Sequence, residues 1–177
     1  GINPAGALSS TLVAQKTQKF QLYQQMAQLL VGHDATGSIR KFDQDGDLTT
    51  GNKFDDCIFF DFSRLLVKDE IKKGSFSLEL GAAASYTVPF PQRITLKDNN
   101  GNTAYKVNSP AGEYGILYAE NAAGVPLNGI TGSTQQPAGL IYYQAGVAVL
   151  TASVFTGLLS SSVNMNFVDT VNAMFTG

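Results

Sequence analysis

Apolar and polar residues alternate along two segments in the middle of the chain, residues 75–80 and 93–97. Alternation with a period of two residues is typical of a strand that buries one face. The residues from Asp98 to Gly101 include two asparagines before the glycine, which predicts a tight turn. We expect this turn to join 93–97 to a returning strand at 104–107. Two further short strands are predicted at 57–62 and 115–119.

A different pattern occupies residues 139–143 and 147–152, where nearly every position is apolar. The three residues between these segments end in Gly146, so the chain can reverse there and form a hairpin. Because both faces of each strand are apolar, we expect this hairpin to be covered on both sides and to lie at the centre of the fold.

The N-terminal part of the chain has helical periodicity. Ser9 or Ser10 can cap a helix that spans residues 11–31, and Gly32 is a suitable stop. Spacings of three and four residues predict one apolar side, which consists of Phe20, Tyr23, Met26, Ala27, Leu30 and Val31.

Residues 1–10 contain proline, glycine and asparagine, which predicts an extended N-terminal arm that docks on a neighbouring subunit. Near the C-terminus, Phe167, Val171 and Phe175 recur at helical spacing and predict a short helix over 163–175. Together these patterns predict a mainly β (α+β) protein. We expect residues 11–177 to form one antiparallel β-sandwich or barrel-like domain with a long N-terminal helix and a short C-terminal helix.

Charge is scarce and unevenly distributed. Of the 177 residues, 15% are charged, against about 25% in a typical soluble domain. Between Asn121 and Gly177 the only charged side chain is Asp169. Because interface cores are depleted of charge, this favours a surface covered by partner subunits. The alternative is an exposed surface kept soluble by uncharged polar side chains.

Several function classes are disfavoured by composition. A net charge of -2 provides no basic stripe for nucleic acid, and no apolar run is long enough to span a bilayer. Cys57 and His33 are the only residues of their types, which argues against zinc sites and catalytic triads. No glycine-rich phosphate loop precedes a helix. We therefore expect no enzyme activity, no catalytic residue, no cofactor or metal, and no small-molecule substrate.

The segment from Asp43 to Asp47 is the one stretch similar to a cation-binding loop. An EF-hand needs glycine at its sixth position and an acidic residue at its twelfth. Counted from Asp43, those positions hold Leu48 and Phe54. The failure at both positions favours a solvated acidic turn without a metal.

Residues 60–64, 68–80, 94–99 and 139–150 together resemble virion structural proteins of contractile-tailed (myovirus-type) marine phages and cyanophages. The resemblance lies in an aromatic strand ending in Ser-Arg, a Lys- and Glu-rich turn, an alternating strand and the late apolar hairpin. It implies a non-enzymatic protein located in the virion, with copies of itself and other virion proteins as partners. The tail, baseplate or neck is expected in preference to capsid decoration. The alternative class is a bacterial surface or pilus-type adhesin subunit.

Eight apolar residues are candidate assembly contacts, because they lie in the arm, in the charge-poor hairpin or in the predicted C-terminal helix. They are Ile2, Pro4, Leu8, Tyr142, Tyr143, Val149, Phe167 and Phe175.

Overall fold

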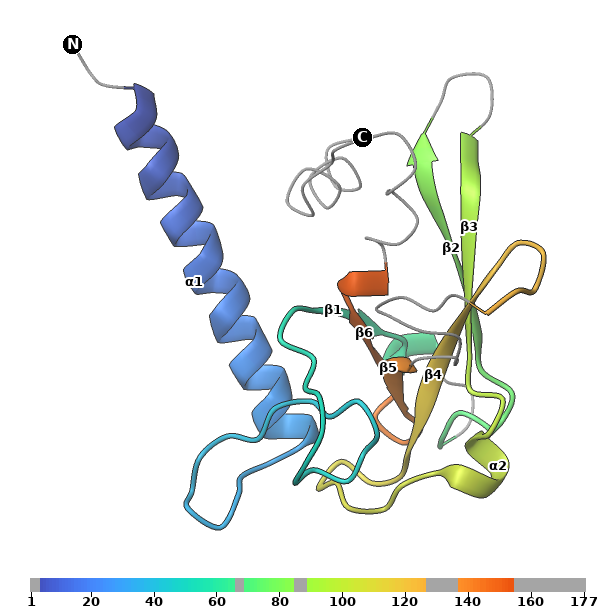
Figure 1. Cartoon of the computed structure of the whole chain (residues 1–177). Helices are drawn as coiled ribbons and strands as arrows, with labels where there is room; N and C mark the ends of the chain where they lie inside the picture. Colours follow the sequence, from blue (N-terminus) through green and yellow to red (C-terminus); the bar gives the residue numbers. More distant parts are fainter. Residues whose placement is uncertain (1–3, 66–68, 85–88, 127–136, 155–177) are drawn as a thin grey trace.

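Six antiparallel strands form a single sheet that curls into a half-barrel (Figure 1). The computed structural model describes residues 4–65, 69–84, 89–126 and 137–154. The strands are β1 (Cys57–Asp61), β2 (Ser77–Ala84), β3 (Pro89–Lys97), β4 (Tyr114–Asn121), β5 (Pro137–Tyr142) and β6 (Val147–Thr151). Their order across the sheet is β1-β6-β5-β4-β3-β2. The prediction of a mainly β protein is confirmed.

Of the two predicted architectures, the β-sandwich is wrong for the described strands, because all of them belong to this one sheet, whereas the barrel-like alternative agrees with the curled half-barrel. A sandwich covers its sheet with a second sheet. Here one face is covered by the end of an N-terminal helix, α1 (Pro4–Leu30), and by the long segment that follows it. Because the sheet curls, the side chains on its other face pack against one another. They also contact the aromatic residues that flank β1 and β2.

The β5–β6 hairpin is at the centre of the sheet, as its sequence predicts. Both strands have neighbours on both sides, and every residue of β6 is buried. Leu140, Tyr142 and Val149 contribute to the core on the helix side, whereas Ile141 and Ala148 contribute to the core on the opposite side. Successive side chains point to opposite faces of a sheet, so an all-apolar strand fills both cores at once.

Helix α1 starts earlier than expected. It begins at Pro4, so the predicted extended arm over residues 1–10 is wrong from residue 4 onward. Proline is well tolerated in the first helical turn, where its missing N–H has no partner in any case, and Ala5, Ala7 and Leu8 favour helix. The end is as predicted: Gly32 adopts a positive φ of 80° two residues after Leu30, the last residue of the helix.

Only the C-terminal turns of α1 pack on the sheet. Tyr23, Met26, Ala27, Leu30 and Val31 contact the core there. Toward its N-terminus the helix runs away from the sheet (Figure 1). Phe20, predicted to share the buried side, is instead 61% exposed, because it lies beyond the part of the helix that the sheet reaches.

The predicted strand at 104–107 is wrong. Residues Gly101–Ala104 form a short helix, α2, and of the expected strand only Lys106 makes a bridge, with Tyr114. The side chain of Asp98 is buried and accepts hydrogen bonds from the backbone of Gly74 and Phe76, so the chain turns inward here. The predicted C-terminal helix lies outside the described residues. No helix in the described part of the chain has the length and hydropathy needed to cross a membrane.

Candidate functional site

Residues 43–53 form a loop, here called the acidic loop, between α1 and β1. Its two ends are held by buried aromatic residues, Phe42 and Phe54, and the amide of Phe54 donates to the carbonyl of Phe42 at 2.9 Å. Asp43 and Lys53 form an isolated antiparallel bridge just inside this pair. The loop is therefore closed at its base by the core of the protein, and its polar residues are held in a fixed arrangement.

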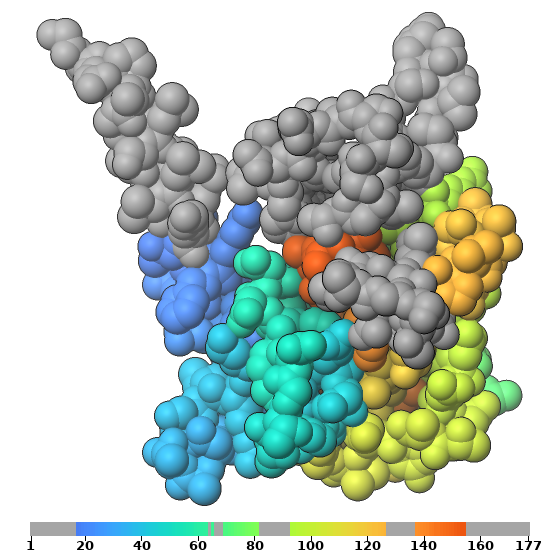
Figure 2. Space-filling view, in the orientation of Figure 1, coloured from blue at the N-terminus to red at the C-terminus, as the bar shows by residue number. Residues whose placement is uncertain are grey.

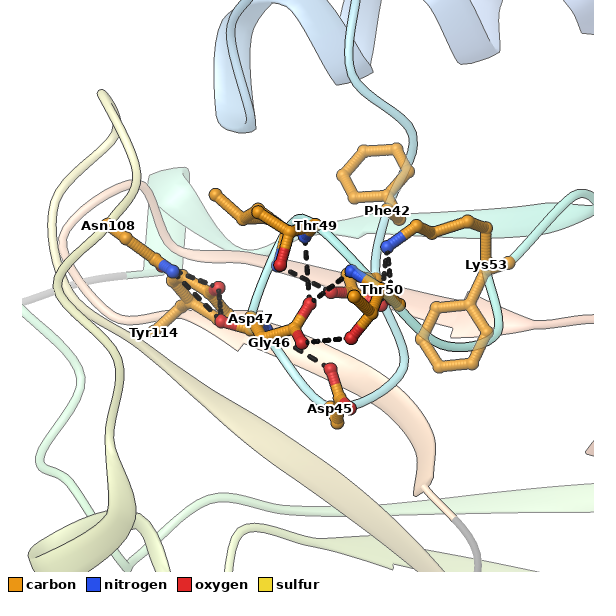
Figure 3. Close-up of polar contacts among 12 residues, drawn as sticks. Phe42, Asp45, Gly46, Asp47, Thr49, Thr50, Lys53, Asn108 and Tyr114 are labelled. Atoms are coloured by element: carbon orange, nitrogen blue, oxygen red, sulfur yellow. Dashed lines mark hydrogen bonds and ion pairs between the residues drawn. The ribbon is translucent and has the colours of Figure 1, made fainter. Parts of the chain in front are cut away.

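The tip of the acidic loop is attached to the sheet. The carbonyl of Gly46 accepts hydrogen bonds from Asn108 Nδ2 at 2.9 Å and from the hydroxyl of Tyr114 at 3.2 Å (Figure 3). Gly46 has a φ of 74°, a backbone conformation that glycine adopts without steric strain. In Figure 2 the blue-green loop and the yellow segment that carries Asn108 meet on the lower part of the visible face. The sequence pattern did not indicate this contact, which joins residues 62 and 68 positions apart.

Three carboxylates gather inside the loop. One oxygen from each of Asp43, Asp45 and Asp47 lies within 4.8 Å of the other two. Asp47 accepts hydrogen bonds from the amides of Thr49 and Thr50 at 2.8 and 2.9 Å and from the Thr50 hydroxyl at 2.6 Å (Figure 3). These donors, the hydroxyl first, lower the pKa of Asp47, which is therefore ionised at neutral pH.

Asp43 differs from its two neighbours because its side chain is 0% exposed. Its Oδ2 accepts a hydrogen bond from the amide of Leu48 at 2.6 Å. Its Oδ1 is buried and accepts no hydrogen bond, although Lys53 Nζ lies 3.0 Å away as an ion-pair partner. The ammonium group of Lys53 donates its own hydrogen bond to the carbonyl of Thr50 at 2.7 Å. Thus Lys53 neutralises one of the three negative charges in the loop.

A second polar cluster lies where the turn of the β5–β6 hairpin meets the end of β3. Asp98 Oδ2 accepts from the amide of Gly74 at 2.7 Å and from the hydroxyl of Tyr143 at 3.1 Å, and Oδ1 accepts from Phe76 at 2.8 Å. Nearby, Lys73 is ion-paired with Glu113, and this contact raises the pKa of the lysine. Each group in this cluster has a protein partner, so the arrangement is that of a structural anchor for residues 69–76.

The structure separates the eight candidate assembly contacts. Tyr142, Tyr143 and Val149 are buried in the two cores, at 1%, 0% and 0% exposure, so they are not surface contacts of the subunit. Their strands lack charge because they fill an interior and not an interface. Pro4 and Leu8 lie in the first turns of α1, where the backbone alone is described. The remaining three, Ile2, Phe167 and Phe175, lie outside the described residues.

The lone cysteine is part of the core region. Cys57 begins β1, and burial raises the pKa of its thiol to about 12. A thiol with such a pKa is a poor nucleophile at neutral pH. Its interpretation as a small apolar residue agrees with this environment.

No protein-family model matches the chain, and neither a curated protein sequence nor a solved structure matches it at a significant level.

Proposed function

We propose that the chain is a non-enzymatic structural subunit of a phage virion. In this proposal it builds the tail, baseplate or neck through contacts with copies of itself and with other virion proteins. Two observations carry the proposal: α1 runs beyond the sheet (Figure 1), and its described residues expose large apolar side chains. The resemblance of residues 60–64, 68–80, 94–99 and 139–150 to virion structural proteins supports an assembly role.

The exposed residues of α1 are arranged for contact with another protein. Leu22 is 49% exposed and Leu29 is 64% exposed. Seven residues span nearly two helical turns, so these two leucines lie on one side of the helix. Phe20 adds a further exposed apolar group on a different side. A helix that lacks tertiary packing is only marginally stable in water, and burial of these side chains by a partner would stabilise it.

The test replaces both leucines by glutamate, in the variant L22E/L29E of the full chain. Sedimentation velocity over a wide concentration range is expected to show self-association of the parent and a monomeric double variant. At concentrations low enough for the parent to be monomeric, both should have the same melting temperature, because neither leucine is in the core. The matched control is Leu65→Glu, at a residue that is 74% exposed on the short 3-10 helix Ser63–Leu65. It should associate like the parent.

A parent chain that stays monomeric throughout, or a double variant with unchanged association, would contradict the assembly role of α1. The location needs a separate measurement, because a pilus-type adhesin also self-associates. Antibodies against the chain should label purified phage particles in electron micrographs. Labelling of the bacterial surface in uninfected cells would favour the adhesin.

A further inference from the structure

We propose that the acidic loop is a calcium-binding site whose protein ligands are Asp43, Asp45 and Asp47. Nothing in the EF-hand template predicts it, because the glycine and the distal acidic residue stand at the wrong positions. The proposal is independent of the virion assignment, since it rests on the oxygen atoms of the loop alone.

Asp43 provides the buried part of the proposed site. Its Oδ1 is a fully buried carboxylate oxygen that accepts no hydrogen bond, and it belongs to the cluster shared with Asp45 and Asp47. Buried carboxylates in proteins are normally hydrogen-bonded, paired or bound to a metal. The ion pair with Lys53 supplies one positive charge, but the lysine is also held by the carbonyl of Thr50. Because a carboxylate oxygen has two lone pairs, Asp43 Oδ1 can bind a cation in addition to its ion pair with Lys53.

The three carboxylate oxygens lie close enough together to bind one calcium ion. Calcium binds oxygen ligands at about 2.3–2.6 Å, so two ligands of one ion are separated by at most about 5 Å. The three carboxylate oxygens, all within 4.8 Å of one another, satisfy this limit without rearrangement of the loop.

The net charge of the acidic loop also suits a divalent cation. Three carboxylates and one ammonium group leave two negative charges in excess at the site, which matches a divalent ion. Asp45 and Asp47 are exposed, so an ion can enter from solvent, while Asp43 forms the buried floor of the site. The bonds from the loop amides hold Asp43 and Asp47 in place before the ion arrives, which reduces the ordering that binding requires.

The experiment titrates calcium chloride into the full chain after treatment with EDTA, by isothermal titration calorimetry and thermal unfolding. We expect one site with a Kd of about 10⁻⁵–10⁻³ M, the range of weak calcium sites. A hundredfold excess of calcium over that Kd should raise the melting temperature by roughly 5–10 °C. The absence of heat and of a melting shift, or an equal shift with magnesium or sodium at matched ionic strength, would overturn the site.

The diagnostic variant is Asp45→Asn. The asparagine oxygen can still accept the bond that Asp45 Oδ1 receives from the amide of Asp47 at 3.1 Å, so the loop keeps its turn while the charge is lost. Calcium should bind this variant at least tenfold more weakly. The matched control is Asp55→Asn, outside the cluster and paired with Lys41 at the surface, which should bind within twofold of the parent. Equal affinity of the Asp45 variant and the parent would refute the assignment.

A variant at Lys53 tests whether the acidic loop binds calcium or whether Lys53 alone serves as its cation. In the variant Lys53→Met the competing ammonium is gone, so calcium should bind roughly tenfold more tightly and restore any melting temperature lost without it. If the variant is destabilised and calcium neither binds more tightly nor restores stability, Lys53 is the permanent counter-ion of Asp43 and the proposal fails.

Discussion

The β5–β6 hairpin and helix α1 use similar apolar residues in opposite ways. In the hairpin, Tyr142, Val149 and Leu150 are within 1% of complete burial, since the strands have neighbours on both edges and both faces. In α1, Leu22 and Leu29 remain largely exposed although they are as apolar as any core residue. The hairpin therefore stabilises the subunit itself, whereas the exposed part of the helix contributes to stability only when another protein covers it.

Matched substitutions of an apolar residue by aspartate should give the largest contrast between the two regions. Val149→Asp places a carboxylate in the core, against a helix face and far from any solvent, and should cost at least about 4 kcal/mol. Leu22→Asp makes the same kind of change on the exposed helix and should alter the free energy of unfolding by less than about 1 kcal/mol. Urea unfolding followed by circular dichroism measures both. If the Val149→Asp variant unfolded at the same urea concentration as the parent, the assignment of β6 to the core would be wrong.

Loss of the Asp98 side chain, which anchors residues 69–76, should have the next largest effect on the free energy of unfolding. Asp98→Ala leaves two backbone amides and the Tyr143 hydroxyl without their acceptor, at a cost of about 3 kcal/mol. The control Asp55→Ala removes an exposed ion pair with Lys41 and should cost no more than about 1 kcal/mol. Similar unfolding midpoints for the two variants would show that the anchor is dispensable.

The buried tyrosines predict a loss of stability at alkaline pH. Burial raises the pKa values of Tyr114, Tyr142 and Tyr143 in the hairpin region, and that of Tyr23 where α1 meets the sheet. The unfolded chain then releases protons near pH 10 while the folded chain retains them, so stability is complete below pH 10 and falls as the pH rises. Urea unfolding between pH 8 and 11 should show this decline. Tyr142→Phe removes one of these titrating groups. The decline of the free energy of unfolding with pH should therefore be less steep by the contribution of one proton.

Thiol reactivity should give the smallest effect, because it leaves the fold intact. With a pKa of about 12, Cys57 is almost fully protonated at pH 8 and should react with Ellman's reagent about 100-fold more slowly than in the unfolded chain. The comparison is a cysteine on the exposed side of α1, made as Gln21→Cys in a Cys57→Ser background, which should react at the rate of a free thiol. Equal rates for the two cysteines would mean that β1 opens readily.

Patterns with a clear period were predicted well from the sequence. The alternating segments and the β5–β6 hairpin form strands, because each buries its apolar positions whatever the order of the strands. The boundaries of α1 show the limit: Gly32 marked the end correctly, but Pro4 was taken as a sign of an extended arm although it suits a first helical turn. Asp98 shows a second limit, since a turn sequence cannot reveal that its side chain anchors a distant loop.

The sequence alone determined that this protein is mainly β, that its last apolar hairpin is central, and that acidic residues gather between Asp43 and Asp47. These features depend on residue type and local spacing, which act over a few positions. Only the tertiary structure decided that one curled sheet forms, that Tyr142, Tyr143 and Val149 are core residues, and that one carboxylate of the acidic loop is buried. Those outcomes depend on which distant segments meet, and burial changes the free energy of a side chain only after they have met.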